Sequence, residues 1–335
     1  MIISVRTPLR VSLFGGGTDY RSYFSRNPGS VLGFAIDKYI YVTALTLNTI
    51  VDYRFRVSYS KVEHVQEAAD IKHPVVRCLL RHYDWDTPAD ISIQSDLPAA
   101  LGLGSSSSFT VGMVHLMSEL ARIPRTRMEL AREAIHTEQV LLQENVGIQD
   151  PLHATFGGMN RFDFQGDDFR IMPINISGRD LEVFTDSMVL VYTGIKRRAT
   201  EIAQEQIERT NMKVLDRELH DMLALVDEAQ ATIEDKRNRE AMVETIGRLL
   251  AETWALKKRL SDRITNRHID ELYEFCLKQG AFGGKLCGAG GGGFLLMIVP
   301  PECRARFEDA VGPSRCMPFR VDVQGTVILQ KSHAA

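Results

Sequence analysis

The sequence predicts an α+β protein with a sheet-rich N-terminal half and a helix-rich C-terminal half. Up to about residue 93, short β-branched and aromatic runs alternate with turn residues, whereas residues 196–279 carry apolar residues at helical spacing. The 335 residues also exceed the roughly 250–300 at which single cores stop growing. We therefore expect two domains, 1–180 and 181–335.

The first half contains four strand-like runs and two helical ones. The strand-like runs have period-2 alternation and cover residues 2–14, 29–47, 52–59 and 89–97. Helical spacing predicts one helix from Ser105 to Leu120 and a second from Arg127 to Asn145. Thr126 and Glu129 have the spacing of a capping box for the second helix.

The second half alternates strand-like runs with a long charged stretch. Strands are expected over residues 157–164, 169–176, 188–194, 292–300 and 319–329. Residues 196–279 predict four helices, and a last helix is expected near 303–311. The apolar positions of the charged stretch drift out of any heptad, so they favour amphipathic helices packed on a sheet over a coiled coil.

Composition narrows the classes of partner and the cellular location. The net charge of −3 gives no broad basic field, so a nucleic-acid partner has no support. No window reaches the roughly 18 uncharged apolar residues of a membrane span, and the sequence starts with a strand-like run instead of a signal peptide. We expect a cytoplasmic monomer or homodimer that has no membrane or nucleic-acid partner.

The five cysteines show neither a C-x-x-C pair nor the spacing of a zinc site. They are odd in number and spread along the chain. Buried reduced thiols are therefore expected.

A glycine- and serine-rich stretch, PAALGLGSSSS (98–108), stands directly before the first predicted long helix. A solvated linker is the ordinary interpretation of such a composition, but a linker would not open a helix. The first N–H groups of a helix lack partners, and the helix dipole is positive at that end. Glycines there let a phosphate approach the backbone, and serine hydroxyls can bind the phosphate or Mg²⁺. The stretch therefore indicates an anion site.

Two further glycine clusters are present. The stretch 288–293 formally matches G-x-G-x-x-G, but a strand follows where a dinucleotide site needs a helix, and no Walker A lysine follows any glycine cluster. The stretch 15–17 ends a strand and precedes Thr18 and Asp19. The alternative to a ligand site here is a turn in which Thr18 or Asp19 caps a helix. Because glycine is entropically costly, three such clusters favour a small-molecule site.

These stretches, in this order, resemble the three sequence motifs of the GHMP kinases, the superfamily of galactokinase, homoserine kinase and mevalonate kinase. PLRVSLFGGGTDY (8–20) is similar to motif one, PAALGLGSSSS (98–108) to motif two and KLCGAGGGGFLLMI (285–298) to motif three. The resemblance implies an N-terminal domain like ribosomal protein S5, a C-terminal helix-and-sheet domain, and ATP and substrate meeting between the two.

Within the superfamily, the stretches 146–164 and 192–203 most resemble the D-glycero-D-manno-heptose 7-phosphate kinases, with the fucokinases as neighbours. Galactokinases carry Glu-His where this chain has Gly16 and Gly17, which argues against galactose. The resemblance implies phosphorylation of the anomeric hydroxyl of a heptose 7-phosphate, which gives a heptose 1,7-bisphosphate on the way to GDP-heptose for surface glycans.

The resemblance also implies the residues that bind ATP and Mg²⁺. The ATP-binding residues expected from motifs two and three are Gly102, Leu103, Gly104, Ser105, Ser106, Ser107, Gly290 and Gly291. Ser106 and Glu138 are expected to hold Mg²⁺, which prefers such hard oxygens and keeps several waters. A solvated helix carboxylate is the alternative for Glu138, and Lys285 is expected to support the 288–293 turn.

The reacting groups follow from the same resemblance. Asp150 is expected to act as the catalytic base, held by Pro151 in a turn or extended conformation at a helix end; a turn-forming aspartate is the alternative. Arg10 is expected to stabilise the transferred charge. The sugar-binding residues expected are Gly16, Gly17, Thr18 and Asp19 for the hydroxyls, with Arg197 and Arg198 for the distal phosphate and Lys38 and Arg161 behind them.

Two other functions remain open from the sequence. The same fold could phosphorylate L-fucose or another hexose. A sugar and ATP sensor without catalysis is a third possibility, although Ser106, Glu138 and Asp150 are all present.

Overall fold

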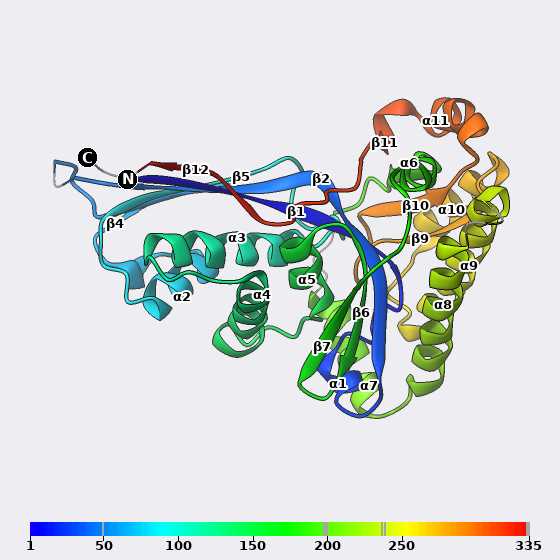
Figure 1. Ribbon diagram of the computed structural model, residues 1–335, viewed down its shortest axis with the longest axis horizontal. Helices are drawn as coiled ribbons and strands as arrows, with labels where there is room; N and C mark the ends of the chain where they lie inside the picture. Colours follow the sequence, from blue (N-terminus) through cyan, green and yellow to red (C-terminus); the bar gives the residue numbers. More distant parts are fainter. Residues whose placement is uncertain (49, 197–199, 236, 238, 333–335) are drawn as a thin grey trace.

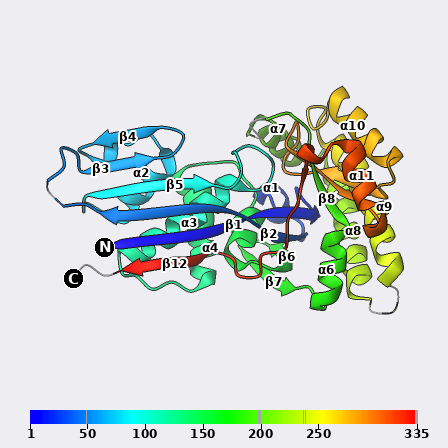
Figure 2. The ribbon, with the colours of Figure 1, turned by 90° about the horizontal axis from the view of Figure 1, so that it is seen from above.

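The strands of the computed structural model form one large and one small sheet, joined by helices (Figure 1). The structure describes residues 1–48, 50–196, 200–235, 237 and 239–332. Figure 2 shows the large sheet at one end of the molecule and the helices α8 to α11 with the small sheet at the other.

The large sheet has eight strands in the order β12-β1-β2-β5-β3-β4, with β6 paired to β2 and β7 to β6. Its strands are β1 (Ile2–Phe14), β2 (Gly29–Thr46), β3 (Phe55–Ser58), β4 (Val62–Val65), β5 (Ala89–Ser95), β6 (Met159–Gln165), β7 (Asp168–Pro173) and β12 (Val327–Ser332). β2 pairs with β6 through its first part and with β5 through its last, while β1 runs antiparallel along its other edge. β1 and β2 therefore connect the two ends of the molecule.

Helices cover one face of the large sheet (Figure 1). They are α2 (Pro74–His82), α3 (Ser105–Leu120), α4 (Arg127–His136) and α5 (Gln149–Phe156). α3 packs directly on β1 and β2 and contacts the other three, so most of its residues are buried. Gly112 permits this approach, since a Cβ there would lie 2.9 Å from Thr7 Oγ1.

The small sheet is antiparallel, in the order β11-β8-β10-β9. Its strands are β8 (Met188–Tyr192), β9 (Gly283–Leu286), β10 (Phe294–Ile298) and β11 (Cys316–Met317). The remaining helices are α1 (Arg21–Phe24), α6 (Gly178–Asp186), α7 (Thr200–Asn211), α8 (Asp216–Glu234), α9 (Arg239–Leu260), α10 (Arg267–Lys278) and α11 (Arg304–Val311). α9 packs on β9, and α8 contacts both α9 and the strands β1 and β2.

Most predicted elements are confirmed, including the four helices between residues 196 and 279 and the Thr126–Glu129 capping box. Two predicted elements are wrong in extent. The helix expected to reach Asn145 changes at Thr137 into a π-helical turn, Thr137–Leu141, and the chain then reverses at Gln143, whose φ is +56°. The strand expected over 319–329 is interrupted where the Asp322 carboxylate accepts hydrogen bonds from Gln324 N and Gly325 N.

The last strand, β12, returns to the large sheet. It pairs antiparallel with β1, so that Ile2 lies opposite Ser332. A strand from the C-terminal half therefore completes the sheet of the N-terminal half. The division near residue 180 stays a prediction.

The five cysteines form no disulfide, and only Cys276 and Cys287 are buried. Burial was expected of all five, but Cys78, Cys303 and Cys316 are half-buried. None of the helices in the described part of the chain combines the length and the apolar composition that a membrane span needs.

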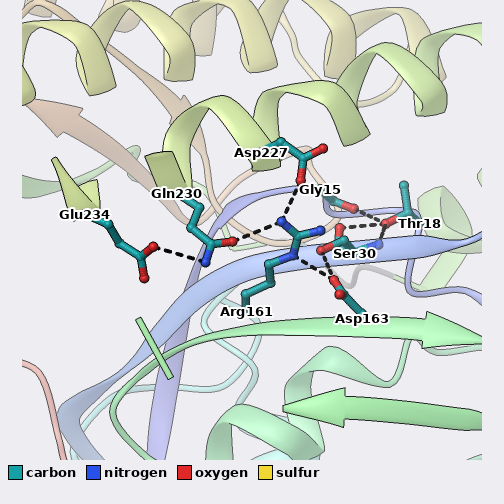
Figure 3. A network of polar contacts seen from close by, with 8 residues as sticks. All are labelled: Gly15, Thr18, Ser30, Arg161, Asp163, Asp227, Gln230 and Glu234. Atoms are coloured by element: carbon teal, nitrogen blue, oxygen red, sulfur yellow. Dashed lines mark hydrogen bonds and ion pairs between the residues drawn. The ribbon is translucent and has the colours of Figure 1, made fainter. Parts of the chain in front are cut away.

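A polar network joins α8 to the end of the large sheet (Figure 3). Arg161 on β6 donates to Asp163 Oδ1 at 2.7 Å, to Asp227 Oδ1 at 2.5 Å and to Gln230 Oε1 at 3.0 Å. Ser30 Oγ donates to the same Asp163 oxygen at 2.6 Å. Arg161 thus joins β6 to α8 and is paired with two carboxylates, and its expected place behind a phosphate site stays a prediction.

Gly15 lies at the edge of this network. A substitution at Gly15 tests how closely α8 and β2 pack against the end of β1. Its φ is +76°, and a Cβ would lie 1.9 Å from Ser30 O and 2.8 Å from Val226 Cγ2 on α8. We expect Gly15→Ala to lower the free energy of unfolding by about 3 kcal/mol or more, since the backbone must shift. Chemical denaturation measures this loss.

The matched control is Gly166→Ala, because Gly166 has a φ of +63° but no atom within 4 Å of its Cβ position. It should lose only about 1 kcal/mol, the cost of the left-handed conformation for alanine. Equal losses in the two variants would show that Gly15 is not closely packed.

Candidate active site

The centre of the site is an ion pair between β1 and α5. Arg10 Nε donates to Asp150 Oδ1 at 2.6 Å, and Arg10 Nη2 donates to Asp150 Oδ2 at 2.7 Å. Arg10 is buried, with 5% exposure, while the Asp150 side chain is 22% exposed. Burial by itself lowers the pKa of Arg10, but the Asp150 carboxylate outweighs it and keeps the guanidinium charged.

Asp150 lies in the first turn of α5, and not in the turn or extended conformation expected from Pro151. A proline is tolerated there because the first N–H groups of a helix have no partner within the helix. The helix fixes the direction of the carboxylate, which a loop would leave free to vary.

The glycine turn of motif two packs against this pair. Arg10 N donates to Leu103 O at 3.0 Å, and Arg10 Nη1 donates to Gly102 O at 2.6 Å. Gly104 caps α3 with φ +75°, and a Cβ there would lie 3.0 Å from Arg10 Cγ and 3.3 Å from Asp150 Oδ2. Only a glycine allows the start of α3 to lie this close to the ion pair.

The serines of motif two differ in exposure. Ser105 is half-buried and Ser106 is exposed, whereas Ser107 and Ser108 are buried. Ser108 N makes the first bond of the helix, to Gly104 O, so the N–H groups of the three preceding serines open toward the helix start. This is the arrangement of an anion-binding helix N-terminus.

Motif three supports the turn of motif two. Gly288 approaches Gly102 so closely that a Cβ on it would lie 2.5 Å from Gly102 Cα. The N–H of Gly291 donates to Ile264 O at 2.8 Å, and a Cβ on Gly290 would lie 2.8 Å from Ile264 Cα. The Gly291 N–H is thus used within the chain, and ATP binding by Gly290 and Gly291 stays a prediction.

Two buried lysines fix these loops. Lys257 on α9 donates to Leu286 O at 2.8 Å and also to Gly288 O. Lys285, which was expected to support the 288–293 turn, donates instead to Leu13 O at 2.7 Å and so ties motif three to motif one. The turn is held by Lys257 because that side chain reaches it from α9. Burial lowers the pKa of Lys257, and it lowers the pKa of Lys285 to about 8.

Glu138 lies on the π-helical turn and is 1% exposed. Burial raises the pKa of its carboxyl from 4.5 to about 8. The Ser107 and Thr110 hydroxyls lie near enough to oppose this rise, but their geometry falls short of a hydrogen bond, and neither Glu138 oxygen has a partner among the described residues. A solvated helix carboxylate, the alternative considered from sequence, does not fit this burial.

The loop of motif one, residues 15–19, lies beside α5. Asp19 is 1% exposed; its Oδ1 accepts from Gly17 N at 2.9 Å and its Oδ2 from Gln149 N at 3.4 Å. Burial raises the pKa of the Asp19 carboxyl, and the Gly17 N–H hydrogen bond opposes that rise. A Cβ on Gly147 would lie 2.0 Å from Asp19 Oδ2, so this glycine makes room for the carboxylate.

Thr18 has a different position from the one expected. It is fully buried, its hydroxyl lies 2.8 Å from Gly15 O and 2.9 Å from Ser30 O, and it accepts from Ser30 N. The hydroxyl therefore holds the loop together, as Figure 3 shows, and does not face a sugar.

The expected phosphate-binding cations are not gathered at this site by the described residues. Arg197 and Arg198 lie outside the described residues. Lys38 donates to Asp37 Oδ1 at 3.2 Å and lines a separate cavity of about 440 Å³ with Arg304 and Arg320.

Sequence reasoning missed Lys257, which fixes the loops of the site, and it missed three side chains that each bury a polar atom without a partner among the described residues: Ser12, Gln149 and Gln206. Lys257 belongs to the charged run KKRL, whose pattern resembles a solvated helix face. Gln149 precedes Asp150 directly, which was a usable signal, whereas Ser12 and Gln206 stand in segments that read only as strand and helix.

The comparisons with known proteins agree with this geometry. The family model described as GHMP kinases N terminal domain matches residues 66–158, and the one described as GHMP kinases C terminal matches residues 238–314. Together the two matches cover just over half of the chain.

Among curated relatives, a D-glycero-alpha-D-manno-heptose 7-phosphate kinase of Campylobacter jejuni is 29% identical over 89% of this chain and 90% of its own. A mevalonate kinase of Pyrococcus abyssi is 26% identical over 90% and 82%. A bifunctional fucokinase/GDP-fucose pyrophosphorylase of Arabidopsis thaliana is 25% identical over 91% of this chain, which spans 31% of that relative.

Solved structures share the fold. A D-glycero-D-manno-heptose 1-phosphate kinase from B. thetaiotaomicron superposes with a TM-score of 0.80 over 99% of this chain and all of its own, at 22% identity. A galactokinase of Lactococcus lactis complexed with galactose gives 0.71 over 98% and 94%, at 19% identity. From its two family domains and these relatives, the chain belongs to the GHMP kinases and is an ATP-dependent kinase that transfers phosphate to a hydroxyl group.

Proposed function

We propose that the protein phosphorylates the anomeric hydroxyl of D-glycero-D-manno-heptose 7-phosphate and gives heptose 1,7-bisphosphate, a precursor step toward GDP-heptose. The observation that carries a phosphotransfer role is the Arg10–Asp150 pair against the glycine turn at the start of α3. The heptose acceptor is supported by the C. jejuni relative, whose similarity extends along nearly the whole of both chains.

Asp150 serves as the base in this proposal. Its carboxylate is partly exposed beside the start of α3, and Arg10 holds both of its oxygens in one orientation. Each carboxylate oxygen keeps a lone pair free for the proton of an acceptor hydroxyl. The transferred proton would then lie at a carboxylate whose position is fixed before substrate binds.

Arg10 stabilises the charge of the transferred phosphate. Three of its five N–H groups donate to Asp150 and to Gly102 O, so two have no partner among the described residues and can donate to phosphate oxygens. The N–H groups at the start of α3 add the positive end of its dipole. The terminal phosphate of ATP would thus lie between the helix start and the guanidinium.

Glu138 fits the Mg²⁺ that such a kinase requires. It offers two buried carboxylate oxygens with no partner among the described residues, and the motif-two serine hydroxyls lie on the adjacent first turn of α3. No cluster of three or more ligating side chains occurs in the described ranges, so phosphate oxygens and water would complete the shell. When bound, the ion neutralises phosphate charge. Ser106 as the serine ligand stays a prediction, while the hydroxyl of the buried Ser107 lies close to Glu138.

An activity assay with a panel of sugars identifies the acceptor. ATP consumption is measured with D-glycero-D-manno-heptose 7-phosphate, D-mannose 6-phosphate, L-fucose and D-galactose, and the product is located by phosphorus NMR. We expect the highest kcat/KM for the heptose phosphate, with a new phosphate on C1. Preference for free L-fucose would favour the fucokinase alternative, and binding without turnover of any sugar would favour a sensor.

Replacing Asp150 tests the proposed base. Asp150→Asn keeps the shape and one hydrogen-bond acceptor for Arg10, but it removes the proton acceptor. We expect kcat to fall by about 10²–10⁴-fold, with the KM for ATP unchanged. Steady-state kinetics on the sugar turned over by the wild type measures this.

The control for this substitution is Asp168→Asn. Asp168 is an exposed carboxylate on β7 that pairs with Arg132, so the same chemical change occurs away from the site. Its kcat should match the wild type. Full turnover by Asp150→Asn would instead assign Asp150 a structural role.

Glu138→Gln should change the pH dependence of stability in the absence of Mg²⁺. The raised pKa of about 8 means that the folded protein binds a proton that the unfolded chain releases near pH 4.5. The stability from this group is complete below pH 4.5 and is lost as the pH rises to 8. Wild type should therefore lose a few kcal/mol relative to the glutamine variant between pH 5 and 8.5, at about 1.4 kcal/mol per pKa unit.

Urea denaturation of both proteins across this range measures the difference. Adding Mg²⁺ and ATP at pH 8 should stabilise the wild type more than the variant, because the ionised carboxylate binds the ion more strongly than the glutamine amide does. Parallel pH profiles for the two proteins would show that Glu138 is not buried as described.

A further inference from the structure

Three polar side chains around the loop of motif one each have a buried atom without a hydrogen-bond partner in the described part of the chain. The atoms are Ser12 Oγ on β1, Gln149 Oε1 on α5 and Gln206 Nε2 on α7. The residues are 6%, 9% and 5% exposed, respectively. We call this set the neutral polar cluster.

The two glycines of the loop bring the cluster together. A Cβ on Gly16 would lie 3.6 Å from Ser12 Oγ and 3.8 Å from Gln149 Nε2. A Cβ on Gly17 would lie 2.5 Å from Gln206 Nε2, so any side chain there would displace this amide. Three separate elements thus direct polar groups at two adjacent residues that have no side chains.

The energetic cost of unpaired buried polar groups indicates that the neutral polar cluster binds a ligand. A buried polar group without a partner destabilises the folded state, and native proteins leave few of them. The cluster also lies beside the proposed base, because Gln149 precedes Asp150 in α5 and its N–H binds Asp19. A ligand that supplies the missing partners at this place would lie next to the reacting carboxylate.

We propose that Ser12, Gln149 and Gln206 bind the ring hydroxyls of the acceptor sugar and so determine which sugar is accepted. The unpartnered amide nitrogen donates, the amide oxygen accepts and the serine hydroxyl does both, which matches hydroxyl groups that are themselves donors and acceptors. None of the three is charged, so the set complements a sugar ring and not a phosphate. This inference rests on the proposed kinase function and identifies residues within it.

The first test is Gln206→Met, which keeps the size of the side chain and removes the amide. We expect the KM for D-glycero-D-manno-heptose 7-phosphate to rise about 10- to 100-fold, with the KM for ATP unchanged. The melting temperature without substrates should stay equal or rise, because an unsatisfied amide is replaced by an apolar group. A purely structural glutamine would instead lower it.

Gln204→Met is the matched control on the same helix. The Gln204 amide is already bonded, since it accepts from Asn145 Nδ2 and donates to Glu208 Oε1. Both KM values should stay at the wild-type level. Ser12→Ala should repeat the effect of Gln206→Met from another element.

Deoxy sugars separate direct contact from indirect effects. The wild type should lose affinity for heptose 7-phosphates that lack one ring hydroxyl, and Gln206→Met should be insensitive to the loss of the hydroxyl that Gln206 binds. If every analogue is weakened equally in both proteins, the contact does not exist.

The inference and the proposed function fail in different ways. If the wild type turns over L-fucose or D-galactose and not the heptose phosphate, the proposed function fails, and the same variants are measured on that sugar. The inference is overturned when the sugar KM is unchanged in Ser12→Ala and Gln206→Met, when the KM for ATP rises equally, or when Gln206→Met melts well below the wild type.

Discussion

The buried ion pair between Arg10 and Asp150 is the constraint on which the site depends. A guanidinium removed from water is stable only with a carboxylate and further acceptors around it, and here the Gly102 carbonyl supplies one. β1, α5 and the turn before α3 must therefore meet at one point. Once they do, the start of a helix, a fixed carboxylate and a cation with unused N–H groups lie together, which is what phosphoryl transfer to a hydroxyl needs.

The glycines of the three motifs serve mainly to let segments approach one another. Gly104 admits Arg10 and Asp150 to the start of α3, and Gly102 lies directly on Gly288. The buried Lys257 binds two carbonyl groups of motif three, which stabilises a loop whose glycines contribute no side-chain packing. Motif three consequently supports the glycine turn before α3, and its own amide at Gly291 is used within the chain.

Local sequence patterns predicted most helices and strands. They failed where contacts between residues far apart in the sequence determine the structure. Alternation and helical spacing identified β1, β2, α3 and the helices α7 to α10. The return of β12 to β1 joins residues more than 300 positions apart, and no local signal carries that pairing. Glu138 was expected on an ordinary helix, because a π-helical turn keeps helical composition. Thr18 was expected to bind a sugar hydroxyl and Lys285 the 288–293 turn, but both side chains bind backbone carbonyls that only the fold brings near.

Four of the buried side chains that have an unsatisfied polar atom, Glu138, Ser12, Gln149 and Gln206, divide by chemistry. Glu138, which can carry a charge, lies beside the first turn of α3, where an anion and its cation would bind. Ser12, Gln149 and Gln206 are neutral and lie around Gly16 and Gly17. The Arg10–Asp150 pair lies between the charged group and the neutral ones. It packs against Gly104 at the start of α3, and Asp150 directly follows Gln149 in α5. A nucleotide with its metal on one side and an uncharged sugar ring on the other would satisfy both sets at once, with the transferred phosphate and the accepting hydroxyl meeting at this pair.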